Sequence, residues 1–384
     1  MSRKLATVTK VKKFFPIEGA DRIEAAIMTT NNWVCVVKKG EFAADAWGVY
    51  FEIDSFLPKE ERYIFLDGRS NKTMDGVEGY RLKTVKLKKQ ISQGLLMPLS
   101  AFPEITNPHE GDDVTELLNV KLYEPPDAHQ GGRQMSNNCT LRPFPAFVRK
   151  TDQERIQSFG TLQLMMLDNQ KYEVTEKIDG TSATYYFNKG RFGVCSRNHE
   201  VSTAFDKMNI LQRFIHWITK TFFGKKSETK SGISAGVSQS VYEDMAIKYN
   251  LGTTLPALCN KLGVNLAVQG EIAGTSVSSN RLKLDSADFY VFDVFNINTQ
   301  EYMDAEERYE IARRLGLQHV PVIDKSYTLN LHETPIEKLI ESADGKSALS
   351  DNPREGLVYK SRNENTPQVS FKVISNNYLL KHSL

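Results

Sequence analysis

The ten residues at 173–182 constrain the fold more than any other stretch of the chain. They read Glu-Val-Thr-Glu-Lys-Ile-Asp-Gly-Thr-Ser, and the β-prone run Ala-Thr-Tyr-Tyr-Phe follows at 183–187. An Asp-Gly pair between two such runs predicts a strand, a tight turn and a second strand. Lys177 would then stand at a strand end, where its side chain can enter a cleft. Its amine could attack phosphorus only when neutral, so burial or a nearby cation, such as a divalent metal ion, would have to lower its pKa.

Lys177 also has a simpler interpretation, as a surface residue paired with Glu176 or Asp179. A match as short as Lys-x-Asp-Gly does not decide between the two, because four-residue patterns are common. Five later segments bear on the choice, since each is β-rich and ends in, or centres on, an ionisable or aromatic residue. They lie at 195–198, 268–274, 289–294, 354–360 and 369–374. With Lys177 they supply a nucleophile, carboxylates for a metal ion, cations for phosphate and a ring that can stack on a base.

The composition limits which fold and function classes are possible. With 384 residues, 40% of them hydrophobic and 25% charged, the chain can bury a sizeable core and should form two domains. A formal net charge of +2 means that any nucleic-acid surface must be a local patch. Cys35, Cys139, Cys195 and Cys259 form no Cys-x-x-Cys pair, which argues against a zinc site or a disulfide framework and for a reducing compartment. No long apolar run occurs, so we expect a soluble, intracellular protein without membrane contact.

Residues 1–122 show short β-prone runs divided by turns, at 34–37, 48–54, 80–87 and 95–99. Several such strands in this length predict a small barrel. The stretch 16–24, together with Asp54, Pro58 and 92–94, resembles the oligonucleotide-binding (OB) folds that are appended to RNA enzymes.

The richest basic run of this segment is a candidate RNA surface, because cations spaced along a strand can follow phosphates. It comprises Arg81, Lys83, Lys86, Lys88 and Lys89. The alternative is a solvated edge strand protected by lysines. The rings of Trp33, Phe42 and Trp47 could offer stacking faces, although a place in the barrel core is the simpler interpretation for each of them.

A linker is expected at 123–146, which is rich in proline, glycine, serine and asparagine. The capping-box spacing at 151–154 predicts a helix that continues through Ile156, Leu162, Met165 and Met166. Arg155 is a further candidate for RNA contact. A second helix is expected after Asp206, with an apolar stripe at 210–222, and a mobile insertion near 224–240.

In their order, these six segments resemble the ATP-dependent polynucleotide ligases of the covalent nucleotidyltransferase superfamily, and the resemblance spans nearly all of residues 146–384. DNA ligases and capping enzymes usually place arginine where this chain has Ser182, whereas Thr181-Ser182 is similar to the RNA ligase branch that seals nicks in duplexes. An OB domain before the transferase domain is typical of the Naegleria-type RNA ligases.

The resemblance implies an α+β fold: an N-terminal OB-type β-barrel at 1–122, then a nucleotidyltransferase (adenylation) domain at 147–384. That second domain would have two antiparallel sheets with flanking helices and an ATP cleft between them. It also implies an RNA ligase that acts as a monomer on a duplex nick. Lys177 would take AMP from ATP, AMP would pass to an RNA 5′-phosphate, and a 3′-hydroxyl would displace it.

The resemblance also implies the site residues. Asp179, Glu271 and Glu355 would face Mg²⁺ or Mn²⁺, because carboxylate oxygens suit these hard cations. Contacts to the nucleotide would come from the same three carboxylates and from Thr175 and Glu176 near adenine, Phe292 stacked on it (with Phe289 as the alternative ring), Arg197 at the ribose or 5′-phosphate, and Lys360 and Lys372 at the α-phosphate.

One position departs from the family pattern. Related ligases often carry two lysines in the last segment, whereas this chain has Ser370 at the first of the two positions. Lys372 would then act alone, or Lys381 or another lysine would compensate. Two other functions stay open on the sequence: a GTP-dependent capping-type guanylyltransferase, and a non-catalytic RNA-binding protein on a ligase scaffold.

Overall fold

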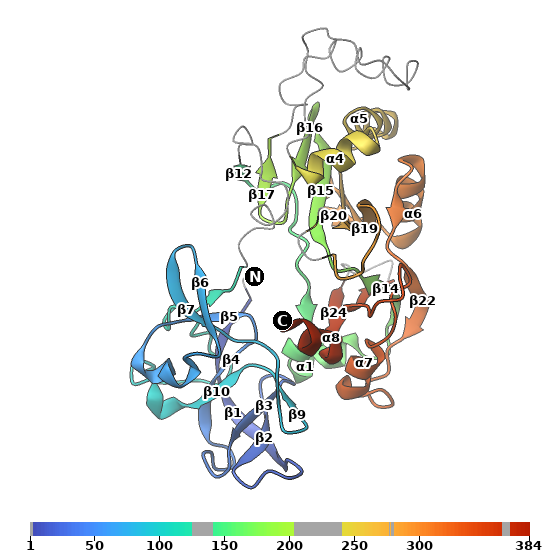
Figure 1. The fold of residues 1–384 in the computed structure, drawn as a ribbon. Helices are drawn as coiled ribbons and strands as arrows, with labels where there is room; N and C mark the ends of the chain where they lie inside the picture. The colour runs from blue at the N-terminus through green and yellow to red at the C-terminus, as the bar shows by residue number, and fades with distance from the viewer. Residues whose placement is uncertain (1–2, 125–140, 203–239, 276, 278–279, 363–368) are drawn as a thin grey trace.

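A computed structural model describes residues 3–124, 141–202, 240–275, 277, 280–362 and 369–384 (Figure 1). Residues 125–140 of the linker expected at 123–146, with Cys139, lie outside these residues. So do the expected second helix and all but Ser240 of the insertion expected near 224–240. The chain forms a β-rich N-terminal unit followed by a larger unit built on two sheets. This arrangement confirms the predicted α+β fold.

The N-terminal unit is a curled barrel. Its first sheet has the strand order β10-β4-β1-β2-β3, its second the order β11-β5-β7-β6, and β8 and β9 form a separate hairpin. The long strand β1 pairs with β4 through its first half and with β2 through its second, and the register shifts between Val11 and Lys13. This irregularity lets one strand bend around the barrel. The elements are β1 Ala6–Pro16, β2 Ile23–Met28, β3 Val34–Lys38, β4 Trp47–Phe51, β5 Ser55–Pro58, η1 Glu61–Leu66, β6 Asn71–Met74, β7 Val77–Arg81, β8 Val85–Leu87, β9 Gln90–Ser92, β10 Leu95–Pro98, η2 Leu99–Ala101 and β11 Lys121–Leu122.

Two of the three candidate stacking rings belong to the barrel core. Trp33 and Phe42 are buried. Trp47 is half-buried, and the ammonium of Lys10 lies 4.7 Å from the centroid of its ring. The strand expected at 80–87 is divided, since β7 ends at Arg81 and β8 begins at Val85.

The second unit contains two sheets that we call the large sheet and the small sheet. The large sheet has the order β12-β17-β16-β15-β18-β19-β20, with β21 beside β19, and the small sheet has the order β13-β24-β23-β14-β22. Most neighbours are antiparallel, but β13 runs parallel to β24 and β21 parallel to β19. The strands are β12 Leu141–Pro143, β13 Glu154–Arg155, β14 Lys171–Lys177, β15 Thr181–Asn188, β16 Arg191–Cys195, β17 His199–Val201, β18 Leu266–Ala273, β19 Asp288–Asn296, β20 Glu301–Tyr302, β21 Gln318–His319, β22 Val322–Thr328, β23 Gly356–Ser361 and β24 Ser370–Ile374.

Short helices cover the outer faces of these sheets. Residues of α4, α5 and α6 pack in one core with the large sheet, and residues of α1 and α7 in another with the small sheet. The helices are α1 Thr161–Leu167, α4 Val241–Lys248, α5 Leu251–Leu262, α6 Ala305–Arg314, α7 Ile336–Ser342 and α8 Asn376–His382, with a 3₁₀ turn η4 at Ile156–Ser158. No helix in the described part of the chain is long and apolar enough to cross a membrane.

The prediction of a helix that begins at residue 151 is wrong. The hydroxyl of Thr151 instead shares a hydrogen bond with that of Ser182, and Glu154–Arg155 form β13 beside β24. Helix α1 begins only at Thr161, and its apolar residues Leu162, Met165 and Met166 are 78, 70 and 72% exposed. A parallel strand pairing supplied from residues 371–372 has therefore overridden the local capping signal.

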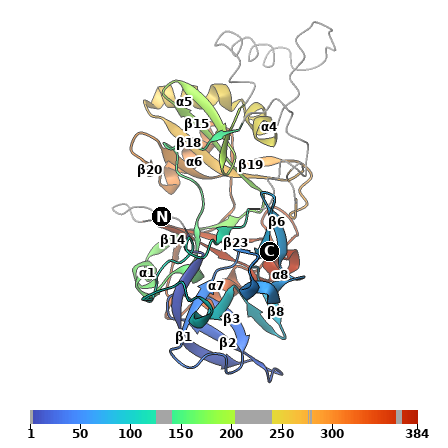
Figure 2. The same ribbon diagram turned by 90° about the vertical axis from the view of Figure 1, so that its left-hand side faces the viewer.

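The predicted strand–turn–strand around Lys177 is present, but its two strands do not pair with each other. Strand β14 lies in the small sheet and β15 in the large sheet, so the chain crosses between the sheets at 178–180. Figures 1 and 2 show the large sheet above the small sheet, with the N-terminal unit beside the small sheet. A Cβ on Gly180 would lie 2.2 Å from the carbonyl oxygen of Ile272, so the crossing requires glycine.

Contacts between the two units place the barrel beside the small sheet. The backbone N–H of Asn32 donates to the carbonyl oxygen of Gln157 at 2.8 Å, and the side-chain amide of Asn32 donates to that of Phe159 at 2.8 Å. At the other end of the interface, the N–H of Thr84 donates to the carbonyl oxygen of Leu384 at 3.2 Å. Hydrogen bonds join the units at both of these places, and Arg155 of β13 adds another to Asp54 of the barrel.

The close approach of β18 and β19 generates a first prediction. A Cβ on Gly270 would lie 2.4 Å from the carbonyl oxygen of Tyr290 and 2.5 Å from the ring of Phe289. We expect Gly270→Ala to lower the free energy of unfolding by about 3 kcal/mol in a denaturant titration, because the added methyl group overpacks the sheet. Gly263→Ala is the control: no atom lies within 4 Å of its Cβ position and its φ is +70°, so only left-handed strain of about 1 kcal/mol is expected. Equal losses in both variants would contradict the prediction.

Candidate active site

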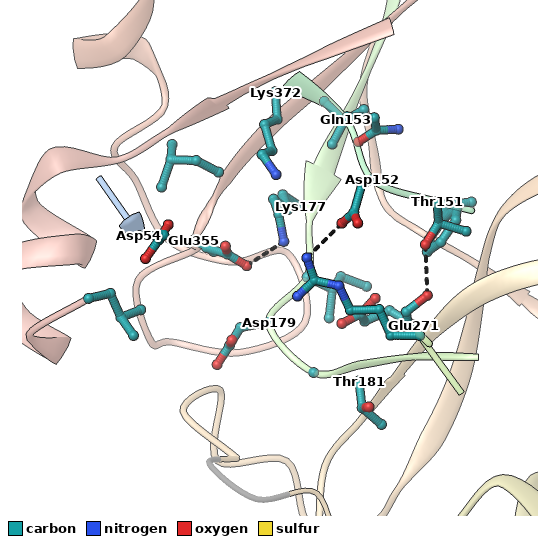
Figure 3. A pocket seen from close by; sticks show the side chains of 18 of the residues that line it. Asp54, Thr151, Asp152, Gln153, Lys177, Asp179, Thr181, Glu271, Glu355 and Lys372 are labelled. Atoms are coloured by element: carbon teal, nitrogen blue, oxygen red, sulfur yellow. Dashed lines mark hydrogen bonds and ion pairs between the residues drawn. The ribbon is translucent and has the colours of Figure 1, made fainter. Parts of the chain in front are cut away.

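A cleft of about 660 Å³ opens where the small sheet, the large sheet and the N-terminal barrel meet (Figure 3). Strand β14 ends in it at Lys177, and the crossing at 178–180 forms part of its wall. Every predicted nucleotide or metal contact lines this one cleft. They are Thr175, Glu176, Lys177, Asp179, Arg197, Glu271, Phe292, Glu355, Lys360 and Lys372. The large sheet and the small sheet thus bring together residues from all six predicted segments.

The amine of Lys177 is held by an ion pair with Glu355. Its Nζ lies 2.8 Å from Oε2 of Glu355, and the two side chains are 25% and 16% exposed. Burial would lower the pKa of Lys177, but the carboxylates of Glu355, Glu271 and Asp179 outweigh it and raise that pKa above its ordinary value. The free protein therefore holds a protonated amine. Nucleophilic attack would require the neutral amine. A positive charge brought in with the substrates would favour this form by lowering the pKa of Lys177.

Glu271 and Asp179 complete the acidic side of the cleft. Burial, with the nearby charges of Glu355 and Asp179, raises the pKa of Glu271 to about 8. Nη1 of Arg281 donates to both carboxylate oxygens of Asp179 at 3.0 Å. Cationic side chains therefore balance part of the negative charge of these carboxylates in the free protein.

The three carboxylates fit a hard divalent cation by their chemistry. Among the described residues no group of three His, Cys, Asp or Glu side chains is close enough to form a ready metal site. Mg²⁺ commonly keeps several of its waters and touches only one or two carboxylates, so wider spacing suits it. Burial, and then the charges of Glu355 and Asp179, raise the pKa of Glu271, and a divalent cation bound beside it would favour the ionised carboxylate.

Lys372 lies on β24 close to Lys177 (Figure 3). Burial and the positive charges of Lys177 and Arg155 lower its pKa to about 7. Its side chain is directed at the cleft and is well placed to meet an anion there. Ser370 precedes it on the same strand, and Lys381 is exposed on α8 and does not line the cleft.

The ring that was predicted to stack on adenine belongs to the wall of the cleft. Phe292 and Lys360 line it, whereas the alternative ring, Phe289, is fully buried and packs edge-on against Tyr185 with centroids 4.9 Å apart. Thr175 is buried on β14. The carboxylate of Glu176 accepts hydrogen bonds from the hydroxyl of Ser347 and, at 2.7 Å, from the N–H of Ala348. Glu176 thus ties the loop after α7 to the cleft.

Comparison with known proteins agrees with this geometry. A family model described as RNA ligase matches residues 170–374, and one described as an OB-fold domain matches residues 5–99. The chain belongs to the RNA ligase family. Among solved structures, a mutant of Naegleria gruberi RNA ligase with AMP and Mn is 35% identical, with a TM-score of 0.80, and 99% of each chain is covered.

Two further structures of the Naegleria gruberi enzyme are similar to this RNA ligase. A mutant with ATP and Mn is 35% identical, with a TM-score of 0.79, and 100% of both chains is covered. The enzyme with PPi is 35% identical, with a TM-score of 0.79, covering 100% of this chain and 99% of that one. No protein in the curated set matches the sequence.

Some cleft residues of this RNA ligase, among them Asp152 and Arg281, are not among the site residues predicted from the sequence. Arg197 is ion-paired with Asp152 at 2.8 Å, and Arg281 holds Asp179. Asp152 falls in the capping-box pattern that predicts the start of a helix, and Arg281 lies outside the six segments. A charged residue beside a strand end is the only signal that could have indicated them, and many surface residues share that signal.

The barrel contributes its own charged group to the cleft. Asp54 pairs with Arg81 at 2.9 Å and with Arg155 of β13 at 3.4 Å, and Arg3 lies beside them on the cleft wall. The charges of Arg155, Arg81 and Arg3 outweigh burial and keep the pKa of Asp54 below its ordinary value. Of the predicted RNA contacts, Arg81 and Arg155 therefore line the cleft. Lys83, Lys86 and Lys88 lie beyond it, on and beside the β8–β9 hairpin.

The lowered pKa of Lys372 predicts how stability depends on pH. Between pH 7 and 10.5 the unfolded chain binds a proton at Lys372 that the folded protein does not, because the pKa is about 7 when folded against 10.5 for an ordinary lysine. The contribution of Lys372 to the free energy of unfolding should therefore rise with pH across this window.

Denaturant titrations of wild type and Lys372→Met from pH 7 to 10 measure this contribution as the difference between them. We expect the wild type to gain stability relative to Lys372→Met as the pH rises. Lys381→Met, at an exposed position on the next helix, should follow the wild type. A difference that is constant with pH would contradict the assignment.

Proposed function

We propose that Lys177 is the nucleophile of an ATP-dependent RNA ligase that joins a 3′-hydroxyl to a 5′-phosphate. The observation that carries the proposal is the place of its amine, 2.8 Å from Glu355 and close to Lys372, in a cleft that also contains Phe292. The Naegleria gruberi structures with ATP, AMP and Mn support ATP as substrate and Mg²⁺ or Mn²⁺ as cofactor.

In the first step, Nζ of Lys177 forms a bond to the α-phosphorus of ATP and pyrophosphate leaves. The proton on the amine must go first, and Oε2 of Glu355 is the acceptor within reach at 2.8 Å. A divalent metal ion bound at Asp179, Glu271 and Glu355 would supply the positive charge that favours the neutral amine and offsets charge on the phosphate. Lys372 neutralises the phosphoryl oxygens, and Arg197 contacts the ribose or the 5′-phosphate.

In the second and third steps the AMP group moves from Lys177 to the RNA 5′-phosphate, and the 3′-hydroxyl then displaces AMP. Phe292 stacks on adenine throughout, while Thr175 and Glu176 border the base. The resemblance implies that Lys360 contacts the α-phosphate, but its ammonium donates hydrogen bonds to the carbonyl oxygen of Phe292 and to Asp293. We therefore propose Lys372 for the phosphate and Lys360 for the base end of the cleft.

We further propose a duplex nick as substrate, because Ser182 stands where DNA ligases and capping enzymes usually have arginine. The proposed domains are 1–122 and 147–384, joined by 123–146. A reducing compartment suits Cys35, Cys195 and Cys259, which are buried and free. We propose that the protein acts as a monomer, since one chain supplies all the proposed catalytic residues.

The first test is a covalent adduct. Wild-type protein incubated with labelled ATP and Mg²⁺ or Mn²⁺ should carry label through a denaturing gel, and Lys177→Ala should carry none, because the bond to phosphorus forms at Nζ. Lys171→Ala removes an exposed lysine from the same strand and should label normally. Label on Lys177→Ala would overturn the assignment, label from GTP alone would indicate a capping-type guanylyltransferase, and wild type without label would indicate a binding protein.

The basic hairpin is tested separately. Lys86→Glu with Lys88→Glu should weaken RNA binding and sealing while leaving lysyl-adenylate formation unchanged, because these exposed lysines lie outside the cleft. If both contact phosphates, the slope of log affinity against log salt should fall by about two. The control, Lys325→Glu with Lys338→Glu, makes the same charge change at exposed positions of the transferase unit. An unchanged slope in the hairpin variant would show a solvated edge instead.

A further inference from the structure

A group of buried charged side chains lies behind the base end of the cleft. Glu173 on β14, Asp293 on β19, Arg308 on α6 and Lys360 on β23 form it, and each has only 1–7% of its side chain exposed. Two carboxylates and two cations balance one another. The adenylation chemistry proposed above gives no role to Glu173, Asp293 or Arg308.

Arg308 is the centre of this group. Its guanidinium donates to the carboxylate of Glu173, its Nη1 lies 4.0 Å from Oδ1 of Asp293, and its Nε donates to Nε2 of His319 at 2.9 Å. The hydroxyl of Tyr309, the next residue on α6, donates to the other oxygen of Glu173. One arginine therefore contacts strands β14, β19 and β21.

Two connections lead from Arg308 to the cleft. In the first, Asp293 accepts a hydrogen bond from Nζ of Lys360 at 2.6 Å. Lys360 also donates to the carbonyl oxygen of Phe292, and its ammonium lies 5.5 Å from the centroid of the Phe292 ring. Lys360 and Phe292 both line the cleft. The position of the proposed adenine platform thus depends on Lys360, and Lys360 on Asp293.

In the second connection, His319 links Arg308 to Val320, which also lines the cleft. Burial and the charge of Arg308 lower the pKa of His319 to about 4, so the ring is neutral at pH 7. Nε2 accepts from Arg308, so Nδ1 carries the proton and donates to the carbonyl oxygen of Val320 at 2.6 Å. The two connections therefore reach the cleft at different places.

The group also joins the two sheets that form the cleft. Glu173 and Lys360 belong to the small sheet, Asp293 and His319 to the large sheet, and Arg308 reaches both from α6. Glu173 precedes Lys177 by four residues on β14, and Asp293 follows Phe292 directly. A shift at Arg308 would therefore alter the distance between the nucleophile and the base platform.

Energetics argue that the group specifies geometry more than it adds stability. Removing charges from water costs several kcal/mol for each ion, and apolar residues of similar volume often stabilise a protein equally well or better. A charged group in this place is instead suited to fixing relative positions, because each hydrogen bond defines a direction as well as a distance.

We propose that Arg308 is a positioning residue for nucleotide binding, which holds Asp293–Lys360 and His319–Val320 so that Phe292 and Val320 enclose the base at a fixed distance from Lys177. The inference rests on the proposed function, since it takes the nucleotide in the cleft to be ATP. It predicts that changes at Arg308 act on ATP affinity and on base selectivity.

The test measures equilibrium ATP binding in a Lys177→Met background, in which no covalent step occurs. Arg308→Met should weaken ATP binding about tenfold or more, since the loss of a hydrogen-bonded buried charge disorders the groups it holds. Arg308→Met should also reduce the ratio of the affinity for ATP to the affinity for GTP. Arg313→Met is the matched control, because its side chain is 73% exposed on the same helix, and it should bind ATP like the background protein.

A double-mutant cycle separates positioning from a general loss of structure. If Arg308 acts through Lys360, Arg308→Met together with Lys360→Met should weaken binding less than the product of the single effects. Arg308→Lys should recover part of the affinity. If Arg308→Met does not fold, Glu173→Gln, which keeps the shape of the carboxylate, takes its place with the same expected coupling.

The outcomes separate the two proposals. A background protein that binds no ATP would refute the proposed function. A background protein that binds ATP, with Arg308→Met binding equally tightly or with fully additive effects of the two substitutions, would refute the positioning role and leave the proposed function intact.

Discussion

The ion pair between Lys177 and Glu355 is the interaction on which the rest of the site depends. It holds the half-buried amine of Lys177 in the cleft and, with Glu271 and Asp179, favours its protonated form, which has no electron pair to donate. Its neighbours are arranged around this balance. The carboxyl groups of Asp179 and Glu271 lie near Lys177, with the pKa of Glu271 raised to about 8. The amine of Lys372, with its pKa lowered to about 7, is also close to Lys177. A nucleotide that arrived with its metal ion would change the charge around all of these groups together.

The chain reaches this arrangement by crossing between sheets where a hairpin would ordinarily turn. Lys177 is the last residue of a small-sheet strand, and within four residues the chain has entered the large sheet at Thr181. Gly180 permits the crossing, since any side chain there would collide with the carbonyl oxygen of Ile272. Lys177 thus stands at the junction of the two sheets. The buried charged group around Arg308 also joins these two sheets, behind the base end of the cleft. Charged side chains therefore lie on both sides of the cleft.

The sequence predicted the site better than the fold around it. The order of the six segments carried the resemblance to polynucleotide ligases, and the residues that this resemblance implies all line one cleft. The helix expected at residue 151 failed because Glu154 and Arg155 pair with a strand more than 200 residues later in the chain, a contact that no local pattern encodes. The partners of Arg308 were equally unpredictable. Glu173 and Arg308 are separated by 135 residues, and either one alone resembles an ordinary surface charge.

Asp54 has a consequence for how the separate units would behave. This barrel carboxylate is the partner of Arg155 in the transferase unit, and two other nitrogens of that guanidinium, Nε and Nη1, are buried without any partner among the described residues. A transferase fragment prepared without the barrel would lose this carboxylate and leave a bare guanidinium beside Lys372. The fragment would also lose Arg3 and Arg81, so its cleft would have one carboxylate and two guanidinium groups fewer than that of the intact enzyme. The barrel therefore gives the cleft positive charge of its own, together with the carboxylate that holds Arg155.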